Sequence, residues 1–227
     1  MTKKIQISSG LTENGIIIGN AYDKYGSKNP IVKRIMKGFH STIDQFITQS
    51  SPTDIHEIGC GEGALTLNWS QQGIKARGSD FSKQVIEIAR SNARKQNLSH
   101  TIFKPLSIYD LKAEEDNADL VVCCEVLEHI ESPEAALESL QKVVQNHLII
   151  SVPREPIWRI LNLLRGKYIL KLGNTPGHIQ HWSRKSFISL VSGYFTIIEA
   201  QHPLPWTILL CKKKAEFQAP SQQKEDS

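Results

Sequence analysis

The sequence lacks a long apolar stretch: no window of its 227 residues reaches the roughly 18 consecutive apolar residues that a membrane-spanning helix requires. Its N-terminus is polar and carries lysines, unlike a secretory signal. Cysteine is also scarce, and the four cysteines form no C-x-x-C pair (Cys60, Cys123, Cys124 and Cys211). Such cysteines are typical of buried free thiols in a reducing compartment. We therefore expect a cytoplasmic protein.

Dense basic patches and stacking aromatics are also missing. The net charge is +4 and aromatic residues make up 7% of the chain, which is weak support for a protein that grips single-stranded nucleic acid. The length fits one domain with one large core. We expect an N-terminal segment and lid helix in residues 1–49, an α/β domain in residues 50–212 with an insertion at 156–182, and a disordered tail in residues 213–227.

The most informative stretch is DIHEIGCGEGA, residues 54–64. A short apolar run is followed by three glycines spaced two apart, the first at Gly59, and then by a helix-like pattern. This order predicts a strand, a tight loop and a helix. Glycine suits such a loop because the sharp turn uses positive φ and because a ligand can lie against the bare main chain. Three interpretations of this loop are open. It could be a dinucleotide fingerprint with Ala64 in the third glycine position, or a glycine turn that binds no ligand. It could also be an E-x-G-x-G-x-G motif that begins at Glu57.

A second acidic residue follows the next predicted strand, in GSDFS (residues 78–82). In doubly wound folds an acid about twenty residues after the glycine loop binds the ribose hydroxyls of an adenosine ligand, and Asp80 is placed to do so. Ser82 is expected to cap the helix that follows. Several classes of adenosine-binding enzyme share this feature, so it predicts the ligand without selecting the chemistry.

The next strand pattern selects among the three interpretations. It reads ADLVVCCEVLEHI (residues 118–130) and precedes Ser132 and Pro133, a cap and first-turn pair for a helix. This pattern, with the glycine motif and Asp80 before it, resembles class I S-adenosylmethionine-dependent methyltransferases of the ubiquinone O-methyltransferase type (methyltransferase types 11 and 12). The resemblance covers residues 54–152. It implies an α/β, Rossmann-like doubly wound sandwich of seven strands, mostly parallel with one antiparallel strand at the C-terminal edge.

The resemblance also implies a set of residues that bind S-adenosylmethionine. At the position where the family usually has an acidic residue near the adenine, this chain has Ser107, with Asp110 as the alternative. Tyr25, ahead of the lid helix, is placed to meet the methionine carboxylate. The predicted set is Tyr25, Glu57, Gly59, Cys60, Gly61, Asp80, Phe81, Ser107, Ile108 and Cys124.

A second group of candidates follows the E-V-L-E-H strand. If the chain turns helical there, Glu125, Glu128 and His129 stand at i, i+3 and i+4 and project from one face. Two carboxylates and an imidazole suit a divalent cation, magnesium or manganese, with zinc as a further option. The segment GHIQHWSR resembles a motif of the methyltransferases that modify the 2′-hydroxyl at the 3′ end of small RNAs, which implies that His178 is the fourth ligand.

The alternative to a metal site is a group of catalytic histidines. Without a cation His129, His178 or His181 would serve as general base, because the pKa of histidine suits that role near neutral pH. Many methyltransferases that resemble this chain use the E-V-L-E-H histidine only to cap a helix or orient a side chain.

Two segments are predicted to cover the site. Pro30 is expected to begin a helix that lies over the cofactor as a lid. The insertion carries an apolar stripe from Ile157 to Leu172 on a basic helix, a pattern that fits a lid packed on the domain or a helix lying on a membrane surface (residues 156–173).

The resulting hypothesis is methyl transfer to a hydroxyl group. The acceptor would be a small molecule or a lipid- or glycan-linked compound, because a metal has less to offer an amine that is already a good nucleophile. An RNA 2′-hydroxyl is the first alternative. A non-catalytic regulator that binds S-adenosylmethionine is the second.

Overall fold

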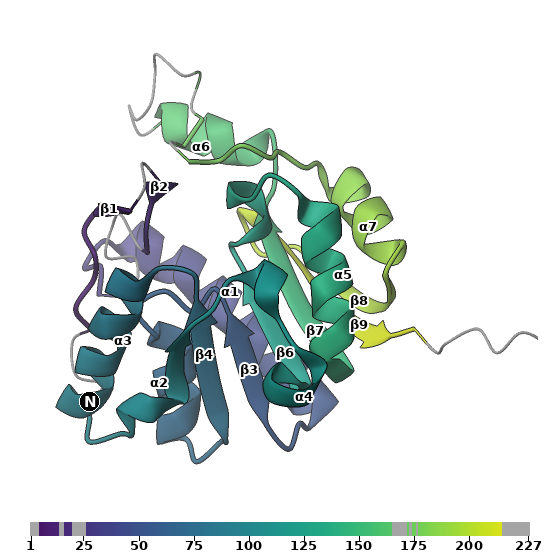
Figure 1. Ribbon diagram of the computed structural model, residues 1–227. Coiled ribbons are helices and arrows are strands. Elements are labelled where there is room, and N and C mark those ends of the chain that lie inside the picture. Colours follow the sequence, from purple (N-terminus) through teal and green to yellow (C-terminus); the bar gives the residue numbers. More distant parts are fainter. Residues whose placement is uncertain are drawn as a thin grey trace, which may run out of the picture.

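The computed structural model describes residues 5–13, 16–19, 26–164, 172, 174–175 and 177–214. Figure 1 shows an open sheet flanked by helices, with a small hairpin, β1 (Thr12–Glu13) and β2 (Ile16–Ile17), and helix α6 (Ile157–Leu164) standing at one end of it. Tyr25, residues 165–171 of the insertion and residues 215–227 of the predicted tail lie outside the described residues. Lys213, placed in that tail, belongs to the last strand.

Seven strands form the main sheet: β3 (Ile55–Ile58), β4 (Ala76–Asp80), β5 (Phe103–Pro105), β6 (Ala118–Cys124), β7 (Val144–Pro153), β8 (Phe195–Gln201) and β9 (Trp206–Lys213). Their order is β5-β4-β3-β6-β7-β9-β8. Strands β3 to β7 pair in parallel, whereas β9 is antiparallel to β7 and to β8. The predicted fold is confirmed. The antiparallel strand, however, lies one position inside the edge, which β8 forms.

Helices cover both faces of the sheet, and strands β6, β7 and β9, which are buried on both sides, carry long apolar runs. On one face lie α1 (Pro30–Ser50), α2 (Ala64–Gln71) and α3 (Lys83–Lys95). On the other lie α5 (Pro133–Val143) and α7 (Arg184–Ser192), which share a core with β6, β7 and β9. Short elements fill the connections: η1 (His100–Ile102), η2 (Ile108–Asp110), α4 (Ala113–Asp116) and η3 (Leu127–His129).

Several helices begin directly after a capping residue or at a proline in the sequence. Pro30 is the first residue of α1, as predicted. The side chains of Asn29, Ser82 and Ser183 each accept a hydrogen bond from a backbone N–H in the first turn of α1, α3 and α7. Each satisfies one of the amides that a helix start leaves without an intrahelical partner.

The described part of the predicted stripe consists of helix α6 and Leu172. Helix α6 ends at Leu164 in the described part of the chain, and Leu172 lies in a turn with φ 49°. Among the described residues, no helix combines the length and apolar character needed to cross a membrane.

Candidate active site at the carboxyl edge of the sheet

The glycine loop joins the carboxyl end of β3 to the start of α2. Gly59, Gly61 and Gly63 have φ of 76°, 53° and 83°, which glycine adopts at little steric cost. A Cβ on Gly59 would collide with the side chain of Val126, and one on Gly63 would collide with the ring of Phe103. The loop therefore needs glycine both for its turns and for close packing.

Asp80 ends β4 beside this loop. Its carboxylate accepts hydrogen bonds from the backbone N–H of Gly61 (3.0 Å) and of Ser82 (3.0 Å). Burial raises the pKa of Asp80, and these two donors oppose the shift. Each carboxylate oxygen has a second acceptor site, so Asp80 can still accept from a ligand hydroxyl.

Glu57 lies on β3, between β4 and β6 in the sheet. It is buried, and its Oε2 accepts from the backbone N–H of Thr66 (3.0 Å) and from the Thr66 hydroxyl. This carboxylate therefore ties β3 to the first turn of α2. A ligand contact of Glu57 stays a prediction.

Glu62 is a residue of the loop that the sequence interpretation missed. It is 1% exposed and accepts from the backbone N–H (2.9 Å) and hydroxyl (2.8 Å) of Ser8. Nearby, Gln6 and Asn92 exchange two hydrogen bonds of 2.9 Å each. These contacts fasten the N-terminal segment across the glycine loop. The signal available in the sequence was an acidic residue inside a loop of small residues.

The other predicted cofactor residues lie near the ends of the same strands. Cys60 and Ile108 are buried, Ser107 and Cys124 are half-buried, and Phe81 is exposed. The Ser107 hydroxyl accepts from the backbone N–H of Tyr109 (3.3 Å) and thereby caps η2. Burial raises the pKa of the Cys60 thiol well above its ordinary value, which suits a packed side chain and not a reactive one.

The condition under which Glu125, Glu128 and His129 would share one helical face is not met. The backbone N–H of Glu125 donates to the carbonyl of Ser151 on β7 (3.2 Å), so strand pairing continues one residue past the end of β6. Glu125 then takes a left-handed φ of 61°, and only afterwards does the chain enter η3. Glu125 and Glu128 consequently do not share a helical face.

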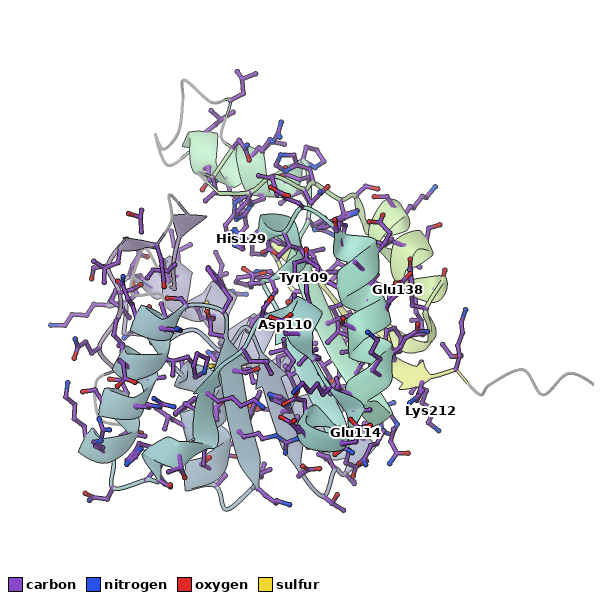
Figure 2. All side chains as sticks on the ribbon, viewed as in Figure 1. Tyr109, Asp110, Glu114, His129, Glu138 and Lys212 are labelled. Carbon is purple, nitrogen blue, oxygen red and sulfur yellow. The ribbon has the colours of Figure 1, made fainter. Side chains whose placement is uncertain are left out.

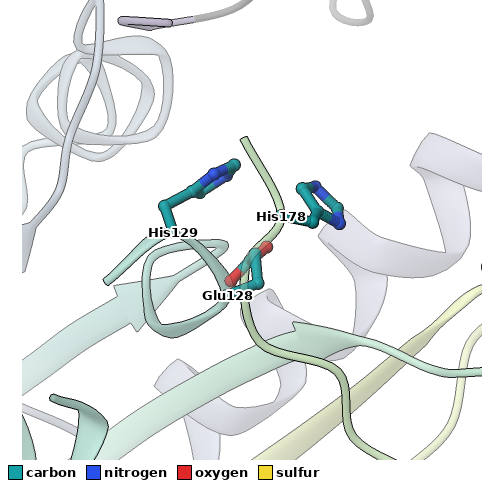
Figure 3. A group of neighbouring side chains, drawn as sticks. All are labelled: Glu128, His129 and His178. Carbon is teal, nitrogen blue, oxygen red and sulfur yellow. The ribbon is translucent and has the colours of Figure 1, made fainter. Parts of the chain in front are cut away.

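Glu128, His129 and His178 nevertheless come together, as Figure 3 shows. One potential ligand atom from each lies within 4.8 Å of the others. The two imidazole rings are 4.9 Å apart and nearly perpendicular. Glu128 and His178 are buried and His129 is exposed. Figure 2 shows His129 at the same end of the sheet as the hairpin. Glu125 is not a member of this group in the part of the chain that the structure describes.

His129 is held by one ring nitrogen. Its Nδ1 lies 3.0 Å from the carbonyl oxygen of Gly177, and a carbonyl can only accept, so Nδ1 carries the hydrogen. In the neutral ring Nε2 then carries the lone pair and is the atom that would bind a cation or a proton.

The segment that carries His178 docks directly onto η3. The backbone N–H groups of Ile179 (2.9 Å) and Gln180 (3.2 Å) donate to the carbonyl of Glu128. This pairing explains why residues 50 positions apart share one site: each follows a strand at the carboxyl edge of the sheet.

His181 lies elsewhere. Its Nδ1 is 3.6 Å from Oε1 of Glu155, which also contacts Arg159 at 3.6 Å. Burial lowers the pKa of His181, the charge of Arg159 lowers it further, and Glu155 opposes both. Within the described residues it does not belong to the group around His178.

A cavity of about 290 Å³ lies at the opposite, amino end of the sheet. It is lined by His56, Arg77, Lys104 and Asp116, among others. Ion pairs join two of these side chains to acids, Arg77 to Asp54 (2.9 Å) and Lys104 to Asp116 (2.6 Å). We therefore assign this hollow to the packing of the sheet and not to the site.

Comparisons with known proteins agree with this geometry. A profile described as a methyltransferase domain, type 11, matches residues 56–150. The ubiquinone biosynthesis O-methyltransferase of Alkalilimnicola ehrlichii is 27% identical over 152 residues, which are 61% of this chain and 61% of that protein. The chain thus spans less than two thirds of the relative's length.

Two solved structures share the fold. Magnesium protoporphyrin IX methyltransferase from Synechocystis PCC 6803, with bound S-adenosylhomocysteine, aligns over 86% of this chain and 94% of its own, with TM-score 0.62 and 20% identity. The methyltransferase domain of a bacterial CtHen1 aligns over 78% and 99%, with TM-score 0.61 and 19% identity. In its motifs and its sheet order, and by these matches, the chain is similar to the class I S-adenosylmethionine-dependent methyltransferases, whose fold it shares.

Proposed function

We propose that the chain transfers the methyl group of S-adenosylmethionine to a hydroxyl group of a small molecule or of a lipid- or glycan-linked acceptor. The observation that carries this proposal is the position of two sites on neighbouring strand ends. The glycine loop and Asp80 follow β3 and β4, while the group of Glu128, His129 and His178 lies beyond β6 and β7. A methyl donor and an acceptor would meet between them.

The loop fits the cofactor. The glycine residues allow the positive φ angles of the tight turn, and Asp80 offers a carboxylate to ribose hydroxyls. When bound, S-adenosylmethionine supplies a methyl group already activated by a sulfonium charge. The chain's own contribution is then mainly alignment, which supports catalysis by removing orientational freedom.

A divalent cation fits the second group. Since Glu125 lies outside it, the donor set is one carboxylate and two imidazoles, with fewer oxygens than the sequence predicted. Imidazole nitrogens suit manganese or zinc better than magnesium, which prefers oxygen ligands. Glu128, His129 and His178 would hold such an ion, and it would favour loss of the acceptor's hydroxyl proton.

If no cation binds, His129 is the best general base of the three predicted histidines. Its Nδ1 donates to the carbonyl of Gly177, so Nε2 carries the lone pair that a general base needs. His178 is buried beside it, and His181 is held by Glu155.

The class of acceptor is the least constrained part of the proposal. The name of the A. ehrlichii relative supports an oxygen acceptor in a small molecule. An RNA 2′-hydroxyl remains the alternative, from the resemblance of GHIQHWSR (residues 177–184) to the small-RNA methyltransferases.

Apolar side chains near the site favour an apolar or membrane-borne acceptor. Ile160, Leu163 and Ile179 of the insertion are 50%, 39% and 52% exposed. We propose that this surface contacts the acceptor or the bilayer that contains it. In sedimentation with anionic vesicles the wild type should bind, and the double variant Ile160→Ser/Leu163→Ser should bind more weakly. Equal binding of the wild type and the double variant would contradict a membrane contact.

The test of the proposed function is turnover. Purified protein, S-adenosylmethionine and Mn²⁺ are incubated separately with a catechol, a prenylated phenol and a short RNA, and S-adenosylhomocysteine is measured. Turnover with a hydroxylated small molecule and its loss in Asp80→Asn support the proposal. Tight cofactor binding without turnover on any acceptor would favour the non-catalytic regulator.

A further inference from the structure

Helix α6 has an unusual distribution of polarity. Asn162 is 4% exposed, while Ile160 and Leu163 on either side of it are half exposed. A surface helix ordinarily buries its apolar residues and exposes its polar ones. A buried amide is costly unless it is hydrogen-bonded, so the orientation of this helix calls for a polar contact beneath it.

That contact is the hydroxyl of Thr175. The Asn162 side-chain N–H donates to Thr175 Oγ1 at 3.1 Å, and the indole N–H of Trp158 donates to the same oxygen at 2.8 Å. Trp158 and Asn162 are four residues apart and so lie on one face of α6. A hydroxyl oxygen has two acceptor sites, and the two donors fill both.

Thr175 begins the turn that carries His178. Its carbonyl accepts from the backbone N–H of His178 at 3.1 Å. Both donors of α6 therefore act on the turn that places the His178 ring opposite Glu128 and His129.

Trp158 also touches the ring of His178 itself. The two rings are 5.8 Å apart and inclined by 24°, close to parallel stacking. The ring centroids of Trp158 and Trp206 are 6.3 Å apart, and those of Trp206 and Phe39 of α1 are 4.9 Å apart. Aromatic rings from α6, β9 and α1 thus pack in succession beside His178.

We propose that Trp158 and Asn162 are positioning residues that hold His178 in its orientation toward Glu128 and His129, with Thr175 as their common anchor. The role of His178 in the reaction rests on the proposed function. The anchoring itself does not, because it concerns the order of one imidazole ring. Supporting contacts of this kind matter because a loosely held ligand or base loses productive geometry.

Thr175 offers a matched pair of variants. Thr175→Val has the same shape without the hydroxyl, and Thr175→Ser keeps the hydroxyl. Asn162→Leu removes the second donor, and Thr196→Val, at an exposed position of β8, controls for the substitution itself. The first measurement is the NMR side-chain dynamics of His178 in ligand-free protein with labelled histidine.

We expect a single ordered His178 ring in the wild type, Thr175→Ser and Thr196→Val, and a mobile ring in Thr175→Val and Asn162→Leu. The second measurement is Mn²⁺ affinity by calorimetry, which should fall roughly 10- to 100-fold in the two mobile variants. Affinity for S-adenosylmethionine should stay unchanged in all of them.

An equally ordered His178 ring in Thr175→Val and in the wild type would overturn the anchoring. If the proposed cation site does not exist, Mn²⁺ will not bind the wild type. The NMR comparison of the His178 ring would still test the anchoring in that case. Melting temperatures separate either result from general unfolding.

Discussion

Gly59 and Val126 lie so close that a Cβ on Gly59 would overlap the Val126 side chain. The glycine loop after β3 and the E-V-L-E-H segment after β6 are therefore in direct contact. This contact places the two halves of the site next to each other.

Gly59→Ala should destabilise the protein and weaken binding of S-adenosylmethionine. It introduces both the overlap with Val126 and a side chain at φ 76°, a conformation that costs roughly 1–2 kcal/mol outside glycine. Gly73→Ala is the control, since Gly73 has φ 82° with open space around it. Chemical denaturation should show a larger loss for Gly59→Ala, and equal losses would contradict the close packing of the two segments.

Asp80→Asn should weaken cofactor binding about ten- to hundredfold. It replaces a carboxylate acceptor by an amide, and a hydrogen bond to a charged group contributes roughly 1.5–3 kcal/mol. Calorimetric titration measures this, with Glu138→Gln on the exposed side of α5 as control. Binding as tight as in the wild type would mean that the ribose lies elsewhere.

His178→Ala and Glu128→Gln should abolish any metal-dependent activity and leave cofactor binding nearly intact. His181→Ala should have a smaller effect, because His181 lies against Glu155 and apart from the group. Methyl transfer is measured with and without a chelator. Full activity after exhaustive chelation would contradict the cation site and favour His129 as general base.

Much of the site could be predicted because its residues follow strand ends. Parallel strands bring their carboxyl ends to one edge, which explains why Gly59, Asp80 and the pair of His129 with His178 all lie there. The condition of a helix from Glu125 is not met, because the backbone pairing with Ser151 is a tertiary contact that a helical spacing argument cannot include.

Hydrogen bonds between residues far apart in the sequence could not be predicted from sequence patterns either. Glu62 bonds to Ser8, 54 positions away, and Asn162 bonds to Thr175 outside its own helix. Neither partner is identified by a period of two or 3.6 residues. The apolar stripe of the insertion correctly indicated a helix, but the buried Asn162 shows that its polar side faces the protein.

Stability should fall in mild acid because of His56. Burial lowers the pKa of this histidine from its ordinary 6.5 to about 4, and nearby Arg77 lowers it too, against a hydrogen bond to the Asp116 carbonyl. Below pH 6.5 His56 is therefore protonated in the unfolded chain, whereas in the folded protein it becomes protonated only near pH 4. The contribution, roughly 3 kcal/mol, is present above pH 6.5 and is lost as the pH falls toward 4.

Urea denaturation of His56→Gln and wild type between pH 7.5 and 4.5 tests this dependence. The variant should have a shallower loss of unfolding free energy with acid, whereas exposed His100→Gln should keep the wild-type slope. Identical slopes for His56→Gln and the wild type would show that His56 is not the titrating group.

The most direct test of the account is the fate of a labelled methyl group. Protein with Mn²⁺ and S-adenosylmethionine carrying a trideuteromethyl group is incubated with a cell extract, and labelled products are located by mass spectrometry and NMR. The account predicts a small or lipid-linked molecule labelled on an oxygen atom, with no such product from Asp80→Asn. Label on nitrogen, on carbon or in the RNA fraction, or no label at saturating cofactor, would contradict it.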